Sequence, residues 1–515
     1  MAHEYAIELK GITKTFGSVV ANNNVELQVR PGEILALLGE NGSGKTTLMN
    51  MLSGIYKPDR GQIFVDGKEV AINSPEDSKR LGIGMVHQHF KLVDVFSAAD
   101  NIWMGREKPG FLLKKDRYSQ IEAIAKKFGF DIDPEKKVHN MSVSEKQTLE
   151  IIKVLYYGAK IIILDEPTAV LTTQETSELF KELINLKNQG YTIIFISHKL
   201  NEIMQITDRM TILRGGKSMG VHNTSDVDPE TISRLMVGRD VVLKVEKEPA
   251  KPTDVVLRVR DLEYTNEWGK KMLDNFSMDL RKGEILGIAG VEGNGQKELV
   301  DMLFNFNVPD YGTITVNGEN ILGVPQRQIR EKGVSLVPED RMIHGIAGTA
   351  SIEENLISDR AGAKELNNGP LFNMKAIHNL SEELIRDYKV LCKSGAQQVK
   401  MLSGGNIQKV VVAREFSNNP KLIIADQPTR GIDVGATEFI RKKLVELSRS
   451  GIAVLLVSAD LNEVMELSDS LIVMYGGKIA AYFEDTKDLN DEIMGEYMLG
   501  LKQQTAEEIG RVCHE

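Results

Sequence analysis

Residues 39–46 read GENGSGKT, a glycine-rich loop that ends in a lysine and a threonine. The spacing fits G-x-x-x-x-G-K-[ST], with an apolar run before the loop and a helical pattern after it, which is the context that the motif requires. Glycines let backbone N–H groups approach phosphate oxygens, Lys45 would neutralise the β- and γ-phosphates, and the Thr46 hydroxyl would ligate Mg²⁺. The alternative is a glycine-rich turn that binds nothing. The expected phosphate-binding residues are Gly39, Asn41, Gly42, Ser43, Gly44, Lys45, Thr46 and Thr47.

A pair of carboxylates follows a second apolar run, in the stretch IIILDE at 161–166. Asp165 is expected to hold Mg²⁺ and Glu166 to polarise an attacking water as the general base. Such an ending is by itself a weak signal, because strands often meet solvent at a charged residue. Together with the phosphate loop it predicts a hydrolytic site.

Three further residues are candidates from their positions. His198 follows the apolar run 192–196 and would contact the γ-phosphate, although a lone histidine there is more often a surface or packing residue. Gln88, in the stretch GMVHQHF, would sense the γ-phosphate or Mg²⁺ with its amide. Phe16 would stack on adenine, and packing against neighbouring side chains is an equally good interpretation of it.

The chain repeats itself. PGEILALLGENGSGKTTL at 31–48 aligns with KGEILGIAGVEGNGQKEL at 282–299, so Gly39 corresponds to Gly290 at an offset of 251. KIIILDEPTAVL aligns with KLIIADQPTRGI, so Asp165 corresponds to Asp426 at an offset of 261. The ten extra residues of the second copy fall between the loop near 88 and the stretch near 141. The chain is therefore a tandem duplication.

The second copy lacks most of the residues expected to do the chemistry. Gln296 stands in place of the loop lysine, Lys297 in place of the threonine, Gln427 in place of the base and Ala459 in place of the histidine. Lys297 could still reach a phosphate from its neighbouring position, so two interpretations remain open: a second site that binds nucleotide without hydrolysing it, and a copy that serves only as a scaffold.

The elements that must position these residues alternate along each copy. Apolar strand-like runs alternate with amphipathic helical segments, which predicts an α/β fold with a parallel sheet. The stretches 89–157 and 340–417 are richer in helical periodicity and are expected to form helical inserts. The expected domains are 5–240 and 254–500, joined by a charged linker at 241–253, with a C-terminal tail at 501–515 that shows no motif.

Composition excludes several classes of protein. A chain of 515 residues with 42% hydrophobic and 26% charged residues indicates a globular protein of several domains. The net charge of −10 argues against nucleic acid as a partner, and two widely separated cysteines suggest neither a disulfide framework nor a zinc site. No apolar run reaches the length of a membrane-spanning helix, and the N-terminal residues do not resemble an export signal.

These motifs resemble the ATPase subunit family of ABC transporters over nearly the whole chain. In that family Lys45, Thr46, Gln88, Asp165, Glu166 and His198 match the P-loop, Q-loop, Walker B and switch-histidine positions. The resemblance implies two tandem P-loop domains, each with a RecA-like parallel-sheet core and a helical subdomain, that bind ATP and Mg²⁺. Thr46, Asp165 and Gln88 would lie around the metal.

The same resemblance supplies a missing element, the signature motif L-S-G-G-Q. The second copy keeps it as LSGGN at 402–406, whereas the first has MSVSE at 141–145. In the family two domains pair head to tail, so Ser403, Gly404 and Gly405 would complete the site of Lys45. The other composite site would combine the altered phosphate loop of the second copy with the altered signature of the first. That correlation favours pairing of the two copies within one chain.

Tandem chains with one degenerate site resemble the ATPases of bacterial monosaccharide and nucleoside importers. His87 and His89 around Gln88 favour the nucleoside type over the ribose or galactose type. The resemblance implies two integral membrane permease subunits, an extracytoplasmic substrate-binding protein and a peripheral position on the cytoplasmic face of the membrane. A tandem ATPase acting on ribosomes would carry a long charged linker and two intact sites. A repair ATPase would show zinc cysteines or a coiled coil, and a purely structural protein would not need Lys45 and Glu166 together.

Overall fold

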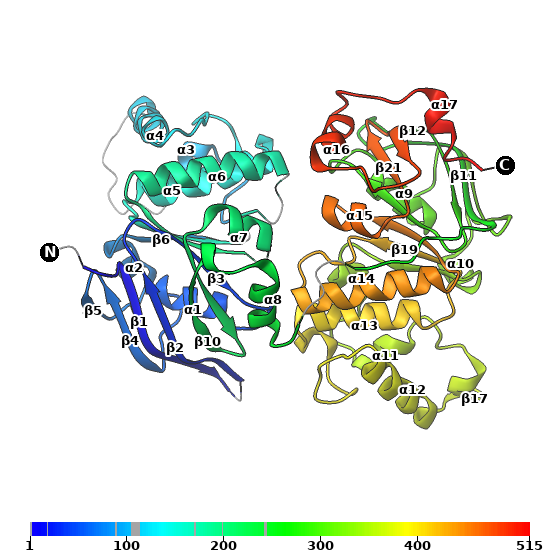
Figure 1. Ribbon diagram of the computed structural model, residues 1–515, viewed down its shortest axis with the longest axis horizontal. Helices are drawn as coiled ribbons and strands as arrows, with labels where there is room; N and C mark the ends of the chain where they lie inside the picture. Colours follow the sequence, from blue (N-terminus) through cyan, green and yellow to red (C-terminus); the bar gives the residue numbers. More distant parts are fainter. Residues whose placement is uncertain are drawn as a thin grey trace. The chain divides into compact units, whose positions relative to one another are not determined.

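The computed structural model describes residues 3–17, 19–87, 90–104, 114–168, 171, 173–197, 199–240 and 245–514. The chain divides into two compact units, residues 1–241 and 242–515, whose elements follow one another in the same order (Figure 1). Every helix in the described ranges is too short or too polar to cross a membrane.

The first unit is built on two sheets. A four-stranded antiparallel sheet has the order β2-β1-β4-β5, and a six-stranded, mainly parallel sheet has the order β10-β9-β3-β8-β7-β6. Strands of the first sheet are β1 (Ile7–Phe16), β2 (Val19–Val29), β4 (Arg60–Val65) and β5 (Lys68–Val70); those of the second are β3 (Ile34–Leu38), β6 (Ile83–Val86), β7 (Ile161–Asp165), β8 (Thr192–Ile196), β9 (Arg209–Arg214) and β10 (Lys217–Asn223). Strands β3, β7 and β8 are buried at every position, which explains why they read as continuous apolar runs rather than alternating ones.

Helices connect these strands and form the predicted insert. They are α1 (Lys45–Leu52), α2 (Pro75–Arg80), α3 (Ala98–Trp103), α4 (Lys114–Phe128), α5 (Val143–Tyr156), α6 (Thr173–Asn188), α7 (Leu200–Ile206) and α8 (Pro229–Val237). Helices α3, α4 and α5 lie in the stretch between β6 and β7, where the helical periodicity predicts them.

The second unit repeats this topology. Its sheets have the orders β12-β11-β14-β15 and β16-β19-β20-β13-β21-β22, which match the first unit strand for strand. The strands are β11 (Val255–Thr265), β12 (Lys271–Arg281), β13 (Ile285–Ala289), β14 (Tyr311–Val316), β15 (Glu319–Asn320), β16 (Val334–Val337), β19 (Leu422–Asp426), β20 (Ala453–Val457), β21 (Ser470–Tyr475) and β22 (Lys478–Phe483). The prediction of two α/β units with mainly parallel central sheets is confirmed.

Its helices are α9 (Gln296–Leu303), α10 (Gln326–Glu331), α11 (Ile352–Ile357), α12 (Met374–Asp387), α13 (Gly404–Phe416), α14 (Val434–Arg449), α15 (Leu461–Leu467), α16 (Asp491–Met498) and α17 (Ala506–Gly510). A hairpin of β17 (Asn367–Asn368) and β18 (Leu371–Phe372) lies between α11 and α12, within the stretch that holds the ten extra residues.

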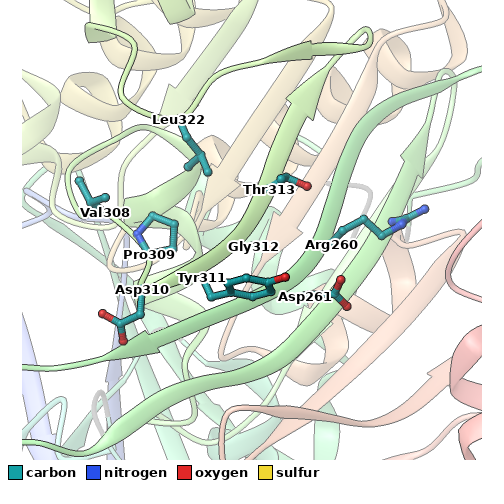
Figure 2. A pocket seen from close by; sticks show the side chains of 9 residues that line it. All are labelled: Arg260, Asp261, Val308, Pro309, Asp310, Tyr311, Gly312, Thr313 and Leu322. Atoms are coloured by element: carbon teal, nitrogen blue, oxygen red, sulfur yellow. The ribbon is translucent and has the colours of Figure 1, made fainter.

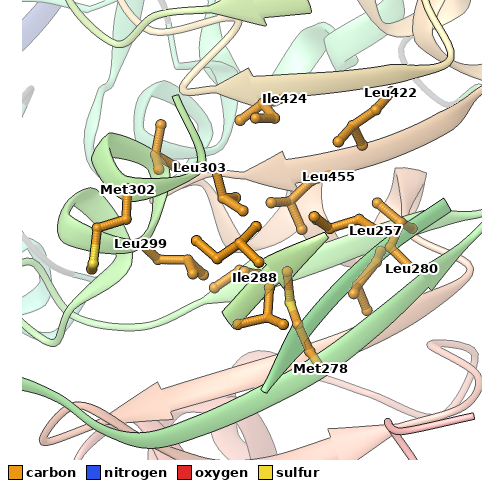
Figure 3. Packing of buried hydrophobic residues seen from close by; sticks show 14 of the residues in the cluster. Leu257, Met278, Leu280, Ile288, Leu299, Met302, Leu303, Leu422, Ile424 and Leu455 are labelled. Atoms are coloured by element: carbon orange, nitrogen blue, oxygen red, sulfur yellow. The ribbon is translucent and has the colours of Figure 1, made fainter. Parts of the chain in front are cut away.

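The core of the second unit joins the two sheets to the helix after the phosphate loop. Leu299 and Leu303 of α9 pack with Ile288 of β13 and Met278 of β12, all of them buried (Figure 3). Because α9 begins at the end of the glycine loop, this packing fixes the direction in which the loop leaves the sheet.

The segments expected to be a linker and a tail both lie on the second unit. Residues 245–253 form no helix or strand, yet the Lys247 ammonium donates to the carbonyl oxygen of Ser468, and Arg449 donates to that of Glu248. In the tail, Val512 is buried in the core, and the backbone N–H of His514 donates to the Asp279 carboxylate at 2.7 Å.

Candidate active site

The first phosphate loop depends on its glycines. Gly39 and Gly44 have φ angles of 150° and 98°, where side chains are strained. A Cβ atom on Gly39 would lie 2.2 Å from the carbonyl oxygen of Leu213, and one on Gly44 would lie 2.3 Å from that of Ala21. The loop therefore passes so close to β2 and β9 that no larger residue fits.

Lys45 is folded back into this loop. Its Nζ donates to the carbonyl oxygens of Gly39 at 2.7 Å and Glu40 at 3.0 Å, and the residue is only 7% exposed. The loop carbonyls thus hold a buried positive charge inside the loop, and contact of Lys45 with phosphate stays a prediction.

Two observations indicate that this loop fits an anion. The Ser43 hydroxyl is buried and has no hydrogen-bond partner among the described residues, although buried polar groups are nearly always paired. Helix α1 begins directly after the loop with no capping side chain and no acidic residue in its first turn. The positive end of the helix dipole is therefore left open for a negatively charged group.

The carboxylates of β7 lie beside the loop. The Thr46 hydroxyl acts to lower the pKa of the Asp165 carboxyl, so two oxygen ligands of the kind that Mg²⁺ prefers are close together. Burial and the adjacent Glu166 carboxylate raise the pKa of Asp165 to about 6, against the opposing effects of Lys45 and Thr46. Glu166 itself has a positive φ of 47°, a backbone conformation that is uncommon for non-glycine residues.

The remaining expected residues divide into two groups. Phe16 ends β1, and 44% of its surface is exposed. Its ring packs edge-on against Tyr56, with 5.2 Å between the ring centroids. The exposed part leaves room for stacking on a base, and the contact with Tyr56 is the packing alternative. Gln88 and His198 lie outside the described residues.

Sequence reasoning missed a buried network beside the position of His198. The Glu202 carboxylate accepts hydrogen bonds from the hydroxyls of Thr168 at 2.6 Å and Ser197 at 2.9 Å. It thereby ties the loop after β8 to the loop after Asp165. The second unit has the same arrangement, with Glu463 accepting from Thr429 and Ser458. Presence in both copies was the available signal, and it indicates a positioning role, since the residues expected to do the chemistry remain in only one copy.

The second phosphate loop substitutes an amide for the ammonium. Gln296 Nε2 donates to the carbonyl oxygen of Val291 at 3.3 Å, which corresponds to the bond from Lys45 to Glu40. The side chain of Gln296 also fills the space where a Cβ of Gly290 would lie, at 2.2 Å. The loop keeps its shape but has lost its central charge.

Acidic residues surround this second loop. Burial, and then Glu339 and Asp301, raise the pKa of Asp426 to about 7. Glu298 stands in the first turn of α9, where the corresponding residue of α1 is Thr47. By the same alignment Asp301 and Glu339 replace Asn50 and Gln88. Negative charge at a helix N-terminus opposes the binding of phosphate. The positive charge of Lys297 acts on the Asp301 and Asp426 carboxyls, so these acidic residues partly offset it.

The side chain of Gln427, which stands where the first copy has the expected general base, is held by a hydrogen bond. Gln427 Oε1 accepts a hydrogen bond from the backbone N–H of Ala459 at 3.0 Å. An amide is too weak a base to take a proton from water. The residue that this amide contacts, Ala459, stands where the first copy has His198. The second unit therefore lacks both the base and the histidine.

The two signature loops differ in what their residues touch. Ser403 caps α13, and its hydroxyl accepts from the side chain of Asn406 at 2.9 Å. A Cβ on Gly405 would lie 2.4 Å from Asp433 Oδ2, so any other residue there would have to displace that carboxylate. In the first unit Ser142 forms a capping box with Glu145, and Val143 is 38% exposed. Only the second unit presents a glycine surface at this place.

A hollow of about 350 Å³ lies on the antiparallel sheet of the second unit (Figure 2). Its charged groups are already engaged, since Arg260 pairs with Asp279 at 2.7 Å and Asp310 accepts from the backbone N–H of Thr265. It holds none of the residues expected to do chemistry.

Comparison with known proteins gives consistent results. The family described as ABC transporter matches twice, at residues 22–169 and 273–430. A guanosine import ATP-binding protein of Bacillus subtilis is 43% identical, covering 98% of this chain and 99% of its own length. A nucleoside import ATP-binding protein of Lactococcus lactis is 41% identical, covering 93% and 95%. A glucose import ATP-binding protein of Haloferax volcanii is 38% identical, covering 98% of both chains.

Among solved structures, an archaeal ribosome recycling factor in complex with a ribosomal stalk protein superposes with a TM-score of 0.60 at 17% identity. The match covers 91% of this chain and 88% of that one. At this identity the similarity shows a shared fold of two tandem units.

Proposed function

Because the chain belongs to the ABC transporter family and is the ATP-hydrolysing subunit of an importer, we propose that the imported compound is a nucleoside. The observation that carries this proposal is the ranking of relatives. Those named for guanosine and nucleoside import are 43% and 41% identical, whereas one named for glucose is 38% identical and one named for ribose and galactose 36%.

Hydrolysis is assigned to the first unit. The glycine loop would hold the phosphates, with Lys45 supplying positive charge. The Ser43 hydroxyl, which has no hydrogen-bond partner in the described part of the chain, would supply a hydrogen bond. Glu166 would take the proton of the attacking water, because it is the carboxylate that directly follows Asp165. His198 and Gln88 are proposed γ-phosphate contacts, and Phe16 an adenine contact, from family resemblance.

Mg²⁺ fits the oxygen pair of Thr46 and Asp165. A hydroxyl and a carboxylate beside a phosphate loop are a typical donor set for this hard cation, which would neutralise charge developing on the phosphates. At neutral pH Asp165 is ionised, since its pKa of about 6 lies below 7. Gln88 is the third proposed ligand.

The signature loop of the second unit is proposed to complete this site. Ser403, Gly404 and Gly405 form the intact motif, and the losses elsewhere all fall on the other combination of motifs. A helix N-terminus with exposed glycine amides would stabilise negative charge on the γ-phosphate.

Permease subunits in the membrane are the partners of an import ATPase, so this chain associates peripherally with the membrane. We place it on the cytoplasmic face, where ATP is available, with two permeases and an extracytoplasmic substrate-binding protein. The acidic net charge of −10 supports the absence of nucleic acid among its partners.

Uptake tests the substrate. Cells that lack the chain should lose uptake of radiolabelled guanosine while they keep uptake of glucose and ribose, and expression of the wild-type chain should restore it. Glu166→Gln should not restore it. Loss of sugar uptake with normal nucleoside uptake would instead support a monosaccharide importer, the alternative favoured by the glucose and ribose relatives.

A further inference from the structure

Arg341 joins two functional loops of the second unit. Its Nη1 donates to the carbonyl oxygen of Arg430 at 2.8 Å and its Nη2 to that of Gly431 at 3.1 Å. A Cβ on Gly404 would lie 3.0 Å from the same Nη2. One guanidinium therefore contacts the loop that follows β19 and lies against the signature loop.

The base of this side chain is itself fixed. Arg341 begins a π-helical turn, Arg341–Gly345, capped by the Asp340 carboxylate, which accepts from the backbone N–H groups of Met342 and Ile343. At the end of the turn a Cβ on Gly345 would lie 3.1 Å from Val411 of α13. The arginine is thus anchored on the helix whose N-terminus carries the signature motif.

By sequence alignment, the first unit lacks the residues that form this arrangement. The positions that correspond to Arg341 and Gly404 hold Phe90 and Val143. Phenylalanine cannot donate a hydrogen bond, and valine puts a branched side chain where Gly404 leaves space. The arginine and the glycine occur together in the unit whose signature is intact, and both are replaced in the unit whose signature is degenerate.

We propose that Arg341 is a positioning residue that holds the signature loop of the second unit against the loop at 430–431. This rests on the proposed function, in which that signature loop contacts the γ-phosphate. An arginine suits the task because its planar fork spans two carbonyl oxygens at once, which a single ammonium cannot do in the same geometry. Misplacement of a contact by about 1 Å can lower turnover by about 10²-fold without weakening substrate binding.

The test is the steady-state ATPase activity of the full-length chain, assembled with its permeases. Arg341→Ala is expected to lower kcat about 10- to 100-fold with KM for ATP changed less than about threefold. Arg341→Lys should recover part of that loss. The matched structural control is Arg360→Ala, because Arg360 also donates to carbonyl oxygens of this unit, at Arg414 and Ser417 near the far end of α13. Its kcat should stay within about twofold of wild type.

Two outcomes separate the failures. If Arg341→Ala keeps wild-type kcat while Ser403→Arg abolishes turnover, the positioning role is wrong and the signature contribution stands. If Ser403→Arg also keeps full turnover, the proposed contribution of the second unit is wrong. Equal losses of kcat in Arg341→Ala and Arg360→Ala, in step with lost folded protein, would reduce Arg341 to a stabilising residue and overturn the proposal.

Discussion

At the scale of single residues, the two copies are an internal control for each other. Lys45 and Gln296 make corresponding hydrogen bonds inside their loops, so the loops differ in charge more than in shape. Glu166 and Gln427 both have positive φ angles, of 47° and 50°, so the backbone that presents the base is kept where the base is lost. The second unit therefore keeps the backbone shape of the site but lacks the residues expected to do the chemistry.

The first prediction concerns Glu166. Glu166→Gln removes the proposed base, so kcat should fall about 10²- to 10⁴-fold while ATP still binds. Gln427→Ala should leave kcat within about twofold of wild type. Turnover by purified protein and equilibrium binding of a fluorescent ATP analogue measure the two quantities, and wild-type turnover in Glu166→Gln would exclude this assignment.

The second prediction concerns the phosphate-loop lysine. Lys45→Ala removes the positive charge in the first loop, so both ATP affinity and turnover at that site should collapse. Gln296→Ala removes only a neutral amide and should change either quantity far less. Equal damage from the two substitutions, in the same binding and turnover assays, would mean that the loops are not asymmetric.

The third prediction concerns pH and the buried aspartates. The pKa of Asp165 is raised to about 6 in the folded chain, so the folded state holds this proton more tightly than the unfolded state. The resulting destabilisation is absent below pH 4, grows as pH rises towards 6 and is complete above that, amounting to about 2–3 kcal/mol. Asp165→Asn should therefore raise the melting temperature of the nucleotide-free chain at pH 8 but not at pH 4.

Asp426→Asn is its matched variant, since the pKa of Asp426 is raised to about 7. It should also stabilise the chain at pH 8, measured by calorimetry. Only Asp165→Asn should abolish Mg²⁺-dependent hydrolysis. If Asp426→Asn abolished it as well, the second unit would take part in the chemistry directly.

At the scale of elements, the C-terminal segment is part of the second unit rather than an appendage. Val512 is 1% exposed within the core, and the Asp279 carboxylate accepts from Arg258, Arg260 and the backbone of His514. Gln504 extends this contact to β22, since its backbone N–H donates to Ala480. The segment therefore covers part of the core where the antiparallel sheet meets β22.

The fourth prediction follows from that packing. Val512→Ala should leave a cavity and destabilise the second unit by about 1–3 kcal/mol, by analogy with other large-to-small core substitutions. Turnover at 25 °C should be unchanged, because the residue lies away from the phosphate loops. Chemical denaturation followed by circular dichroism measures the loss, and an exposed tail would give no change at all.

At the scale of the whole molecule, one intact set of catalytic motifs and one intact signature are divided between two units of the same topology. Each unit keeps its buried strands and its Glu202 or Glu463 network, so neither has decayed as a fold. The division is the pattern expected if hydrolysis on one unit needs a surface supplied by the other.

The fifth prediction tests that dependence. Ser403→Arg should block hydrolysis by the first unit, because the new side chain would occupy the space proposed for the γ-phosphate. Ser142→Arg, at the matching position of the other signature, should leave much of the turnover. The serine is a better probe than Gly404, where an added carboxylate would also meet Arg341. Blocked turnover in Ser142→Arg alone would reverse the proposed pairing.

The amino-acid sequence alone determined the duplication, the α/β fold and the residues of the first phosphate loop with Asp165 and Glu166. These features are short contiguous patterns whose spacing carries their physical meaning, so no knowledge of distant contacts is needed. Tertiary structure alone showed how Glu202, Arg341 and the acidic neighbours of Asp426 are used. Each has at least one partner far away in the chain, as Glu202 has in Thr168 and Arg341 has in Arg430. A side chain's residue type does not say which distant carbonyl or carboxylate folding will bring beside it.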